Sequence, residues 1–371
     1  MSNSSITFFQ VGNGNFTLIQ LGDTNIVVDT NGTKEELGEE GKTPLEMLSP
    51  FLPEEGGALR LDVLCITHGD KDHCGGFTEF KEQMDEGRLL IGEIWHPNYD
   101  RTLVTDDLPE DYLDLHDEIL RRREVETDEY GDVEIPLTAW EDEEDAFVAL
   151  EKPNGFSMKV LSPYIKDEGD EDWDVNDVSL VLNLEIEGLS ILFPGDSSAK
   201  TWQERIIPYT LNSDEMEDWA EAEFLIASHH GSYSFFGEDR DEVREANPHP
   251  ENYEALDYVN PDHLLVLSEK HFPTSRDEPG QQPPQYAAYK WYHKWFRENR
   301  GVSEEDKHPE EFKYTADGHI RLEHGDDGWE LVDDWSPDDD GGGNGDGGGD
   351  DGGKGFRYRR GPTRRRGDEY A

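Results

Sequence analysis

Apolar residues along the chain fall mainly into short runs separated by turns rich in Gly, Asn and Asp, a pattern typical of β-strands. The first three runs, at residues 6–12, 16–21 and 25–29, are joined by Gly-containing turns and predict an antiparallel meander. Further strands are predicted at 61–67, 89–95, 157–162, 178–185, 189–194, 223–228 and 263–268. A closing hairpin is predicted at 312–332, with turns at Asp317-Gly318 and Asp327-Gly328.

Helices are predicted at 44–52, 75–87, 108–124 and 284–299. In the helix at 75–87, Phe77, Phe80 and Met84 recur at spacings of three and four and form one face. The helix at 284–299 has an aromatic face, which we expect to pack on the sheet. This mixture predicts an α/β (α+β) fold in one domain of residues 1–332, with the acidic segment 98–156 as a peripheral insertion.

After Trp335 the sequence consists mainly of Asp and Gly, and it becomes basic from Phe356 to Arg366. Such a composition cannot form a packed core, so residues 333–371 are expected to be a disordered acidic and Gly-rich tail. The basic end is expected to lie against the acidic surface of the protein itself. The alternative is that it binds a protein partner or a nucleic acid.

The charge of the chain is strongly negative, because its 371 residues include 87 Asp and Glu against 33 Lys and Arg, a net charge of −54. Molar salt screens such self-repulsion, since the Debye length falls to about 3 Å at 1 M. The composition resembles that of cytoplasmic proteins from salt-accumulating haloarchaea. It makes broad electrostatic binding of DNA unfavourable, but it does not exclude a nucleic acid as a substrate.

The cysteine content and hydropathy favour a soluble, cytoplasmic protein without membrane contact. Two cysteines, Cys65 and Cys74, are too few for a disulfide framework. The N-terminus lacks the pattern of a signal peptide, and no apolar run is long enough for a transmembrane helix.

The most informative segment is Thr-His-Gly-Asp-Lys-Asp-His-Cys-Gly-Gly at residues 67–76, here called the ligand loop. It follows the apolar run 61–67 and presents four metal-binding side chains within six residues: His68, Asp70, Asp72 and His73. A loop at the end of a buried strand can direct several side chains to one point. Two imidazoles and two carboxylates suit a divalent metal with mixed nitrogen and oxygen ligands.

Later strand ends carry further ligand types. Gly195-Asp196 follows the strand at 189–194, and His229-His230-Gly231-Ser232 follows the strand at 223–228; Asn176-Asp177 precedes the strand at 178–185. Together these groups would suffice for two metals with a bridging carboxylate such as Asp196. Two such ions lower the pKa of a shared water and stabilise the charge of a hydrolytic transition state.

The order of these motifs resembles that of the metallo-β-lactamase superfamily. The run comprises Gly12-Asn13-Gly14, Asp29, the ligand loop, Ser179-Leu180-Val181-Leu182, Gly195-Asp196 and His229-His230-Gly231-Ser232. More narrowly, the chain resembles the soluble domain of the ComEC-type DNA-uptake proteins, which have Asp at the position of Asp70, where the superfamily at large has His.

The resemblance implies a four-layer αββα sandwich with a metal centre at one edge of the sheets. It implies His68 and Asp70 on one metal, Asp72 and His73 on the other, and Asp196 between them. One of His229 and His230 would complete the second site, and the other would contact a phosphate or hold a partner ligand. Asp177 or Asn176 takes the place of the third-motif histidine, Ser232 would bond an anionic substrate, and His271 fits the last motif of the family.

We therefore expect a metal-dependent hydrolase that acts on phosphodiesters, as a nuclease or phosphodiesterase, with Asp72 and His230 as catalytic residues. The metals are expected to be zinc or manganese, with magnesium also admitted because Asp70 is a harder ligand than imidazole. Two alternatives stay open: hydrolysis of a carboxylic ester, thioester or lactam by the same water, and a non-catalytic binding or scaffold protein that retains the fold.

Overall fold

The computed structural model describes residues 4–32, 42–97, 109–124, 147–152, 156–162, 175–208, 216, 218–276 and 282–332. The tail expected at 333–371 and much of the segment 98–156 lie outside the described residues. No helix in the described part of the chain has the length and apolar character that a membrane span requires.

One sheet is built mainly from the N-terminal half of the chain. Its strands are ordered β15-β14-β1-β2-β3-β5-β4, and β6 pairs with the free side of β5. The antiparallel meander predicted at the N-terminus is confirmed, because β1 pairs with β2 and β2 with β3 in that sense. The strands are β1 (Ser5–Phe8), β2 (Phe16–Leu21), β3 (Thr24–Thr30), β4 (Glu54–Glu55), β5 (Ala58–Cys65), β6 (Leu89–Trp95), β14 (Ile320–Gly325) and β15 (Gly328–Val332).

The other sheet has the order β13-β12-β11-β10-β9-β8-β7. Strands β10, β11, β12 and β13 run parallel to one another, whereas β7, β8, β9 and β10 pair in antiparallel fashion. The strands are β7 (Phe147–Lys152), β8 (Phe156–Ser162), β9 (Val181–Ile186), β10 (Leu189–Phe193), β11 (Phe224–Ile226), β12 (His263–Val266) and β13 (Phe312–Tyr314).

The prediction of a single hairpin at 312–332 is wrong. β13 pairs with β12 in the second sheet, and β14 and β15 form a hairpin in the first. The physical reason is burial: Phe312 and Tyr314 pack in the cluster beneath the helices, whereas Ile320 and Leu322 pack between the two sheets. Asp317-Gly318 therefore marks the crossing from one sheet to the other.

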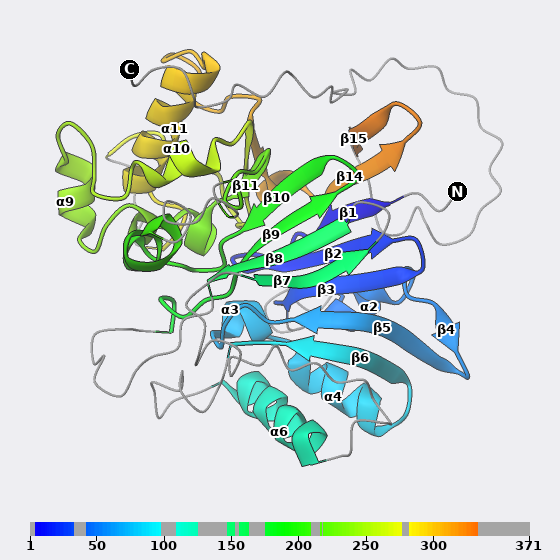
Figure 1. Cartoon of the computed structure of the whole chain (residues 1–371). Helices are drawn as coiled ribbons and strands as arrows, with labels where there is room; N and C mark the ends of the chain where they lie inside the picture. Colours follow the sequence, from blue (N-terminus) through cyan, green and yellow to red (C-terminus); the bar gives the residue numbers. More distant parts are fainter. Residues whose placement is uncertain are drawn as a thin grey trace.

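Helices cover the outer faces of both sheets, as Figure 1 shows with α10 and α11 on one side and α4 and α6 on the other. Helices α2 (Pro44–Leu48), α4 (Phe77–Asp85) and α6 (Glu110–Glu124) share a hydrophobic cluster with the first sheet. Helices α9 (Arg240–Glu245), α10 (Ala255–Val259) and α11 (Tyr286–Arg300) share one with the second. A third cluster lies between the sheets. The expected four-layer αββα sandwich is confirmed.

The aromatic face of α11 packs inward on the second sheet, as predicted. Its residues Trp291, Trp295 and Phe296 are buried in the same cluster as β12 and β13.

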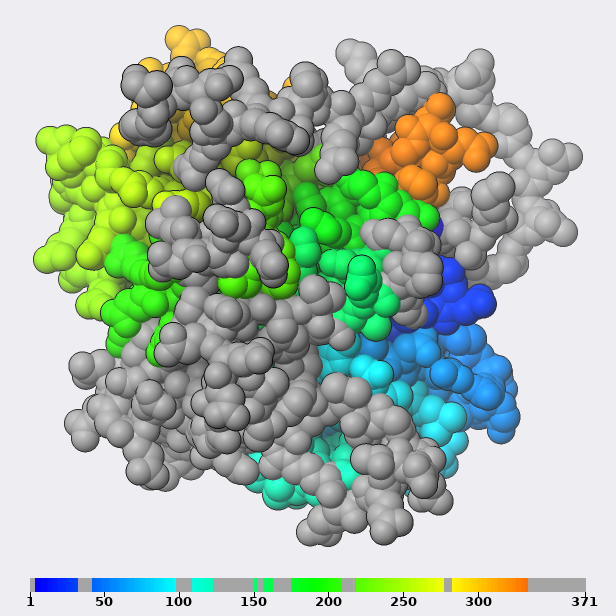
Figure 2. Space-filling model, viewed as in Figure 1, coloured from blue at the N-terminus to red at the C-terminus, as the bar shows by residue number. Residues whose placement is uncertain are grey.

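The surface view in Figure 2 shows helix α9 and the hairpin of β14 and β15 at opposite sides of this face of the molecule.

The segment 98–156, expected to be a peripheral insertion, contributes two described elements to the layers. β7 extends the second sheet by pairing with β8. Helix α6 buries Tyr112, Leu115 and Ile119 against the first sheet and its helices. The acidic composition of the segment favoured a peripheral location, although a few of its positions are apolar and buried.

Helix α6 also caps the start of α4. One carboxylate oxygen of Asp111 accepts hydrogen bonds from the backbone N–H groups of Gly76 and Thr78, both at 3.0 Å. Gly76 is the N-cap of α4 and offers no side chain of its own, so Asp111 supplies the acceptor that the helix end requires. The chain thus ties α6 to the end of the ligand loop.

We predict that Asp111→Ala lowers the free energy of unfolding by about 1–2 kcal/mol, because two backbone donors lose a charged acceptor. Urea denaturation in molar KCl measures the change. Asp117→Ala is the matched control, since Asp117 is an exposed carboxylate on the same helix. Equal effects of the two substitutions would contradict the capping role.

Candidate metal centre

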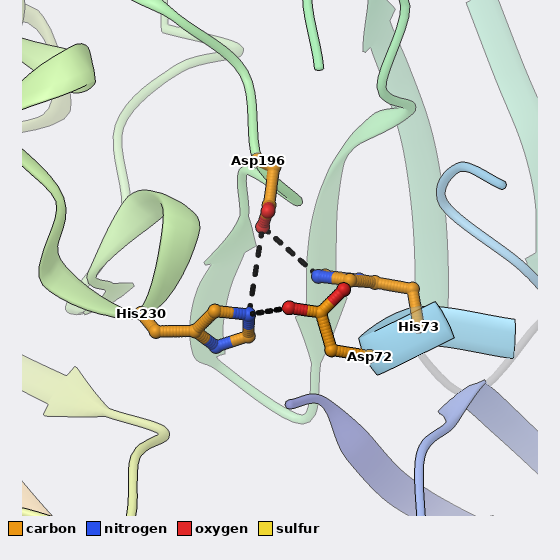
Figure 3. Close-up of side chains that lie close together, drawn as sticks. All are labelled: Asp72, His73, Asp196 and His230. Carbon is orange, nitrogen blue, oxygen red and sulfur yellow. Dashed lines mark ion pairs between the residues drawn. The ribbon is translucent and has the colours of Figure 1, made fainter. Parts of the chain in front are cut away.

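The ligand loop and two later loops meet at one edge of the sandwich. The ligand loop follows β5, Asp196 follows β10, and His229 and His230 follow β11. The side chains converge although β5 belongs to one sheet and β10 and β11 to the other. Figure 3 shows His73 and Asp72 on one side of the site, with His230 and Asp196 facing them.

The path of the ligand loop is set by its neighbours. A short helix, α3 (Lys71–Cys74), begins after Asp70, and Gly76 has a left-handed backbone that starts α4. Gly69 lies against the ring of Tyr112, where an added Cβ would come within 2.2 Å of a ring carbon. Glycine is therefore required at this position, and α6 forms one wall of the loop.

One group of potential ligands comprises Asp72, His73, Asp196 and His230, whose ligand atoms all lie within 4.8 Å of one another. His73 Nε2 lies 2.9 Å from Asp196 Oδ1. His230 Nε2 lies 3.2 Å from Asp72 Oδ2 and 3.9 Å from Asp196 Oδ1, as the dashed lines in Figure 3 mark. Two imidazoles and two carboxylates thus enclose one small space.

A second group comprises His68, Asp70 and Asp72, also within 4.8 Å of one another. His68 Nε2 lies 3.7 Å from Asp70 Oδ2 and 3.7 Å from Asp196 Oδ2. Asp196 therefore directs one oxygen toward each group, which is the position that the sequence assigned to a bridging carboxylate. Asp72 is shared by both groups.

The buried polar atoms of the site fit divalent metals. Within the described residues, none of the following atoms has a well-directed hydrogen bond, although each is buried: His68 Nε2, His73 Nε2, His230 Nε2 and Asp196 Oδ1. Buried polar atoms without partners are costly, and four of them facing one another are unusual in a folded protein. Cations between them would satisfy all four, so the donor set matches the metal site expected from the sequence.

The imidazoles are oriented by groups behind them. Asp29 Oδ2 lies 2.8 Å from His73 Nδ1, and Asp29 Oδ1 accepts a hydrogen bond from the Thr67 backbone N–H at 2.7 Å. The Thr67 hydroxyl contacts both Asp29 and the Nδ1 atoms of His68 and His73. Holding Nδ1 in this way turns Nε2 of both rings toward the site.

Sequence reasoning assigned no role to Asp29 or Thr67. The available signals were the position of Asp29 directly after the apolar residues 26–28 and its place among the motifs of the resemblance. β3 and β5 are parallel neighbours, with Val28 opposite Cys65, so the residues that end these two strands lie side by side. That pairing is not visible in the sequence.

The two adjacent histidines point to different places. His229 and His230 both have a left-handed backbone, with φ of 48° and 54°, which is strained for residues other than glycine. The side chain of His230 is 2% exposed, and its Nδ1 is bonded to the Leu267 carbonyl at 3.0 Å, so Nε2 faces the site. The side chain of His229 is 26% exposed, with Nε2 3.5 Å from Asp196 Oδ2 and Nδ1 3.3 Å from Ser234 Oγ.

The geometry of the two histidines differs. His230 belongs to the group with Asp72, His73 and Asp196, whereas His229 belongs to neither group. His229 instead lines a cleft of about 700 Å³ beside the centre, together with Asp177 and Ser232.

The remaining predicted site residues lie outside both groups. The carboxylate of Asp177 accepts a hydrogen bond from the Ser198 hydroxyl and faces the cleft. Ser232 Oγ accepts a hydrogen bond from the Ser234 backbone N–H. His271 Nε2 pairs with Asp317 at 2.8 Å, and its ring stacks on Tyr314.

Burial and neighbouring charges shift the pKa values of the candidate ligand side chains in opposite directions. Burial by itself would lower the pKa of His73, but the carboxylates of Asp196 and Asp29 outweigh it and hold that pKa well above its ordinary value. The pKa of His230 is likewise raised against burial, by Asp196 and Asp72. Burial would raise the pKa values of Asp72 and Asp196, but the surrounding imidazoles lower both.

Residues 10–157 match the family model described as the metallo-beta-lactamase superfamily. The matched part contains the ligand loop, whereas Asp196 and His230 lie beyond it. None of the curated proteins compared with this sequence matches it. With the ligand groups described above, the family match supports the expected metal-dependent hydrolase.

The solved structures that match the chain share little sequence with it and align with low TM-scores. Human tRNase Z, short form, is 15% identical, with a TM-score of 0.37, over 70% of this chain and 91% of that one. A diphosphatase from the PhnP family is 11% identical, with a TM-score of 0.37, over 84% and 94%. CmlA, a diiron β-hydroxylase from Streptomyces venezuelae, is 17% identical, with a TM-score of 0.37, over 72% and 45%. Their names describe different reactions, and the likeness does not extend to a substrate.

We predict that His230→Ala and His229→Ala differ in metal binding. His230→Ala removes one of four side chains from a ligand group, so we expect the affinity for one metal to fall at least about tenfold. His229→Ala removes none, and its metal content should stay that of the parent protein. Elemental analysis after dialysis in molar KCl with a fixed concentration of Mn²⁺ measures both, and an equal loss from the two variants would contradict the assignment.

We predict that metal binding releases protons and that the release falls as the pH rises. The raised pKa values keep His73 and His230 protonated to higher pH than ordinary imidazoles, and a metal must displace these protons. Above the raised pKa values the imidazoles are already neutral. Titration of Mn²⁺ into metal-free protein in unbuffered molar KCl, at a series of pH values, measures the release.

The same shifts determine the stability of the metal-free protein. The raised pKa values of the imidazoles give stability that is present at low pH and lost as the pH rises through them. The lowered pKa values of Asp72 and Asp196 give stability that is lost only when the pH falls through them.

The control for the proton-release prediction is His271→Ala, which should leave the number of protons released on metal binding unchanged. A release that grows as the pH rises would contradict that prediction.

Proposed function

We propose that this chain, whose residues 10–157 match the family model described as the metallo-beta-lactamase superfamily, hydrolyses phosphodiesters with the help of two divalent metal ions. The observation that carries the proposal is the Asp196 carboxylate, which is 1% exposed and has His68, His73 and His230 around it. The Nε2 atoms of these three rings are buried and have no well-directed hydrogen bond within the described residues. In a scaffold protein without metals, these buried polar atoms would lower the stability of the fold with no compensating interaction.

Each residue has a defined part in this proposal. His68 and Asp70 would hold one ion, and His73 and His230 would hold the other, with Asp72 and Asp196 available to both. Ions held in this way would lower the pKa of a water and neutralise the charge that develops on the phosphate oxygens. The Asp72 side chain is 37% exposed and belongs to both groups, so it is the carboxylate that an incoming water would meet and that can accept its proton.

Asp29 and Thr67 serve the reaction without touching the substrate. Their hydrogen bonds hold the Nδ1 side of His68 and His73, so the rings cannot turn away from the ions. Since Asp70 is an oxygen ligand, the site should accept Mn²⁺ and Mg²⁺ in addition to Zn²⁺.

Two features favour a phosphodiester over a carboxylic ester, a thioester or a lactam. Asp70 replaces a histidine of the superfamily, as it does in the ComEC-type proteins that the sequence resembles. The cleft beside the centre contains the cation of Lys200 and the hydroxyls of Ser198, Ser232 and Ser234, which suit a charged, hydrogen-bonding substrate.

The acidic composition is the basis for proposing that the enzyme acts in the cytoplasm of a cell that accumulates salt. Assays therefore belong in molar KCl. A protein partner bound through the basic end of the tail stays a prediction, because that segment lies outside the described residues.

We predict that Asp196→Asn and Asp72→Asn each lower phosphodiester hydrolysis by at least about a hundredfold, since each removes a charge that both ligand groups share. The measurement is a panel of bis(para-nitrophenyl) phosphate, para-nitrophenyl acetate and a chromogenic β-lactam, with Mn²⁺, Mg²⁺ and Zn²⁺ at high salt.

Asp317→Asn is the matched control, because Asp317 is an exposed carboxylate that pairs with His271 away from both groups. Hydrolysis of the acetate or the lactam with no hydrolysis of the phosphodiester would assign the site to the other substrate class. Unchanged rates in both substituted proteins would place any activity elsewhere.

A further inference from the structure

A cleft of about 700 Å³ opens beside the metal centre and shares His229 with it. His229 Nε2 lies 3.5 Å from Asp196, so a substrate in the cleft would have its reacting phosphate next to the ligand groups. The volume suits a molecule of about the size of a nucleotide or dinucleotide. The described lining residues therefore carry information about the substrate.

Most side chains of the cleft form hydrogen bonds. They include three serine hydroxyls and three amides, contributed by Ser198, Ser232, Ser234, Asn176, Gln282 and Gln285. Several are held in place: Gln285 Oε1 accepts a hydrogen bond from the Tyr233 backbone N–H at 3.0 Å, and Ser234 Oγ contacts His229. Such walls suit a sugar or another polyol more than an apolar group.

The charges of the cleft admit one phosphate better than several. Among the described lining residues, Lys200 and His229 are the basic side chains, and Asp177 and Glu238 are the acidic ones. A polynucleotide brings a negative charge with every nucleotide, and proteins that bind it line their grooves with Lys and Arg. Tyr233 is the aromatic residue in the described lining, which leaves little surface for stacking successive bases.

Salt makes these local charges decisive. At molar salt the Debye length is about 3 Å, so the net charge of −54 has little effect at a distance. Only charges in contact with the substrate still discriminate. The balance within the cleft, and not that of the whole chain, therefore selects the substrate.

We infer that the substrate is a small phosphodiester with a single negative charge and a sugar-like group beside the phosphate, and not a polynucleotide. This inference rests on the proposed phosphodiesterase function. Lys200 faces the charge of the substrate, and Glu238 repels any second phosphate.

The test compares three chromogenic substrates and one polymer with the metal-loaded enzyme in molar KCl. The substrates are the para-nitrophenyl ester of thymidine 5′-phosphate, the same ester with an added 3′-phosphate, bis(para-nitrophenyl) phosphate, and a short thymidine oligonucleotide. We expect kcat/KM to be highest for the first. The added 3′-phosphate should lower kcat/KM at least about tenfold, as expected for a like charge brought into contact.

Glu238→Gln tests the source of the discrimination. It should raise the ratio of kcat/KM for the ester with the added phosphate to that for the plain ester by at least about threefold. Glu304→Gln is the matched control, since it removes the same charge from an exposed side chain paired with Arg297, and it should leave the ratio unchanged. Lys200→Met should raise KM for the plain ester more than it lowers kcat. Metal content, measured for each variant, should stay that of the parent.

The outcomes separate this inference from the function on which it rests. An oligonucleotide hydrolysed with a higher kcat/KM than the thymidine ester would overturn the inference and leave a nuclease. An unchanged ratio in Glu238→Gln would also overturn it. Hydrolysis of no phosphodiester with any of the three metals would overturn the proposed function itself.

Discussion

The buried carboxylate of Asp196 is the group on which the site depends. It is 1% exposed, and imidazoles from both halves of the chain lie around it: His68 and His73 from the ligand loop, and His229 and His230 from the loop after β11. A buried carboxylate is stable only where positive charge or hydrogen bonds compensate for its lost hydration. The imidazoles of His73 and His230, whose pKa values are raised, supply that charge in the metal-free protein, and metal ions would supply it in the loaded one.

The site forms only if the two sheets pack in one relative position, because its side chains come from both of them. The ligand loop belongs to the sheet of β5, and Asp196 and His230 belong to the sheet of β10 and β11. The cluster between the sheets sets their relative position, and the backbone N–H of Leu180 donates to the Thr67 carbonyl directly behind the loop. Helix α6 supports the same loop from outside through Asp111 and Tyr112. Changes far from the metal ligands can therefore act on the centre.

The net charge of the whole chain and the charges inside the metal centre act over different distances. The excess of Asp and Glu over the whole chain acts at long range, and molar salt would screen it. Asp196 and the imidazoles of His73 and His230 are buried and lie 2.9–3.9 Å apart, so salt screens these contacts much less.

The sequence by itself determined most of the strands, the fold class and the ligand types, because these depend mainly on local spacing. The apolar runs ended where His68, Asp196 and His229 begin, and a loop after a buried strand can carry polar ligands in any packing. Only the tertiary structure decided which of two adjacent histidines joins the centre, since that depends on backbone torsions and on the Leu267 carbonyl. It also decided the roles of Asp29 and Asp111 and the sheet to which β13 belongs. Each of these depends on partners 35 or more residues away in the chain, and no local pattern records them.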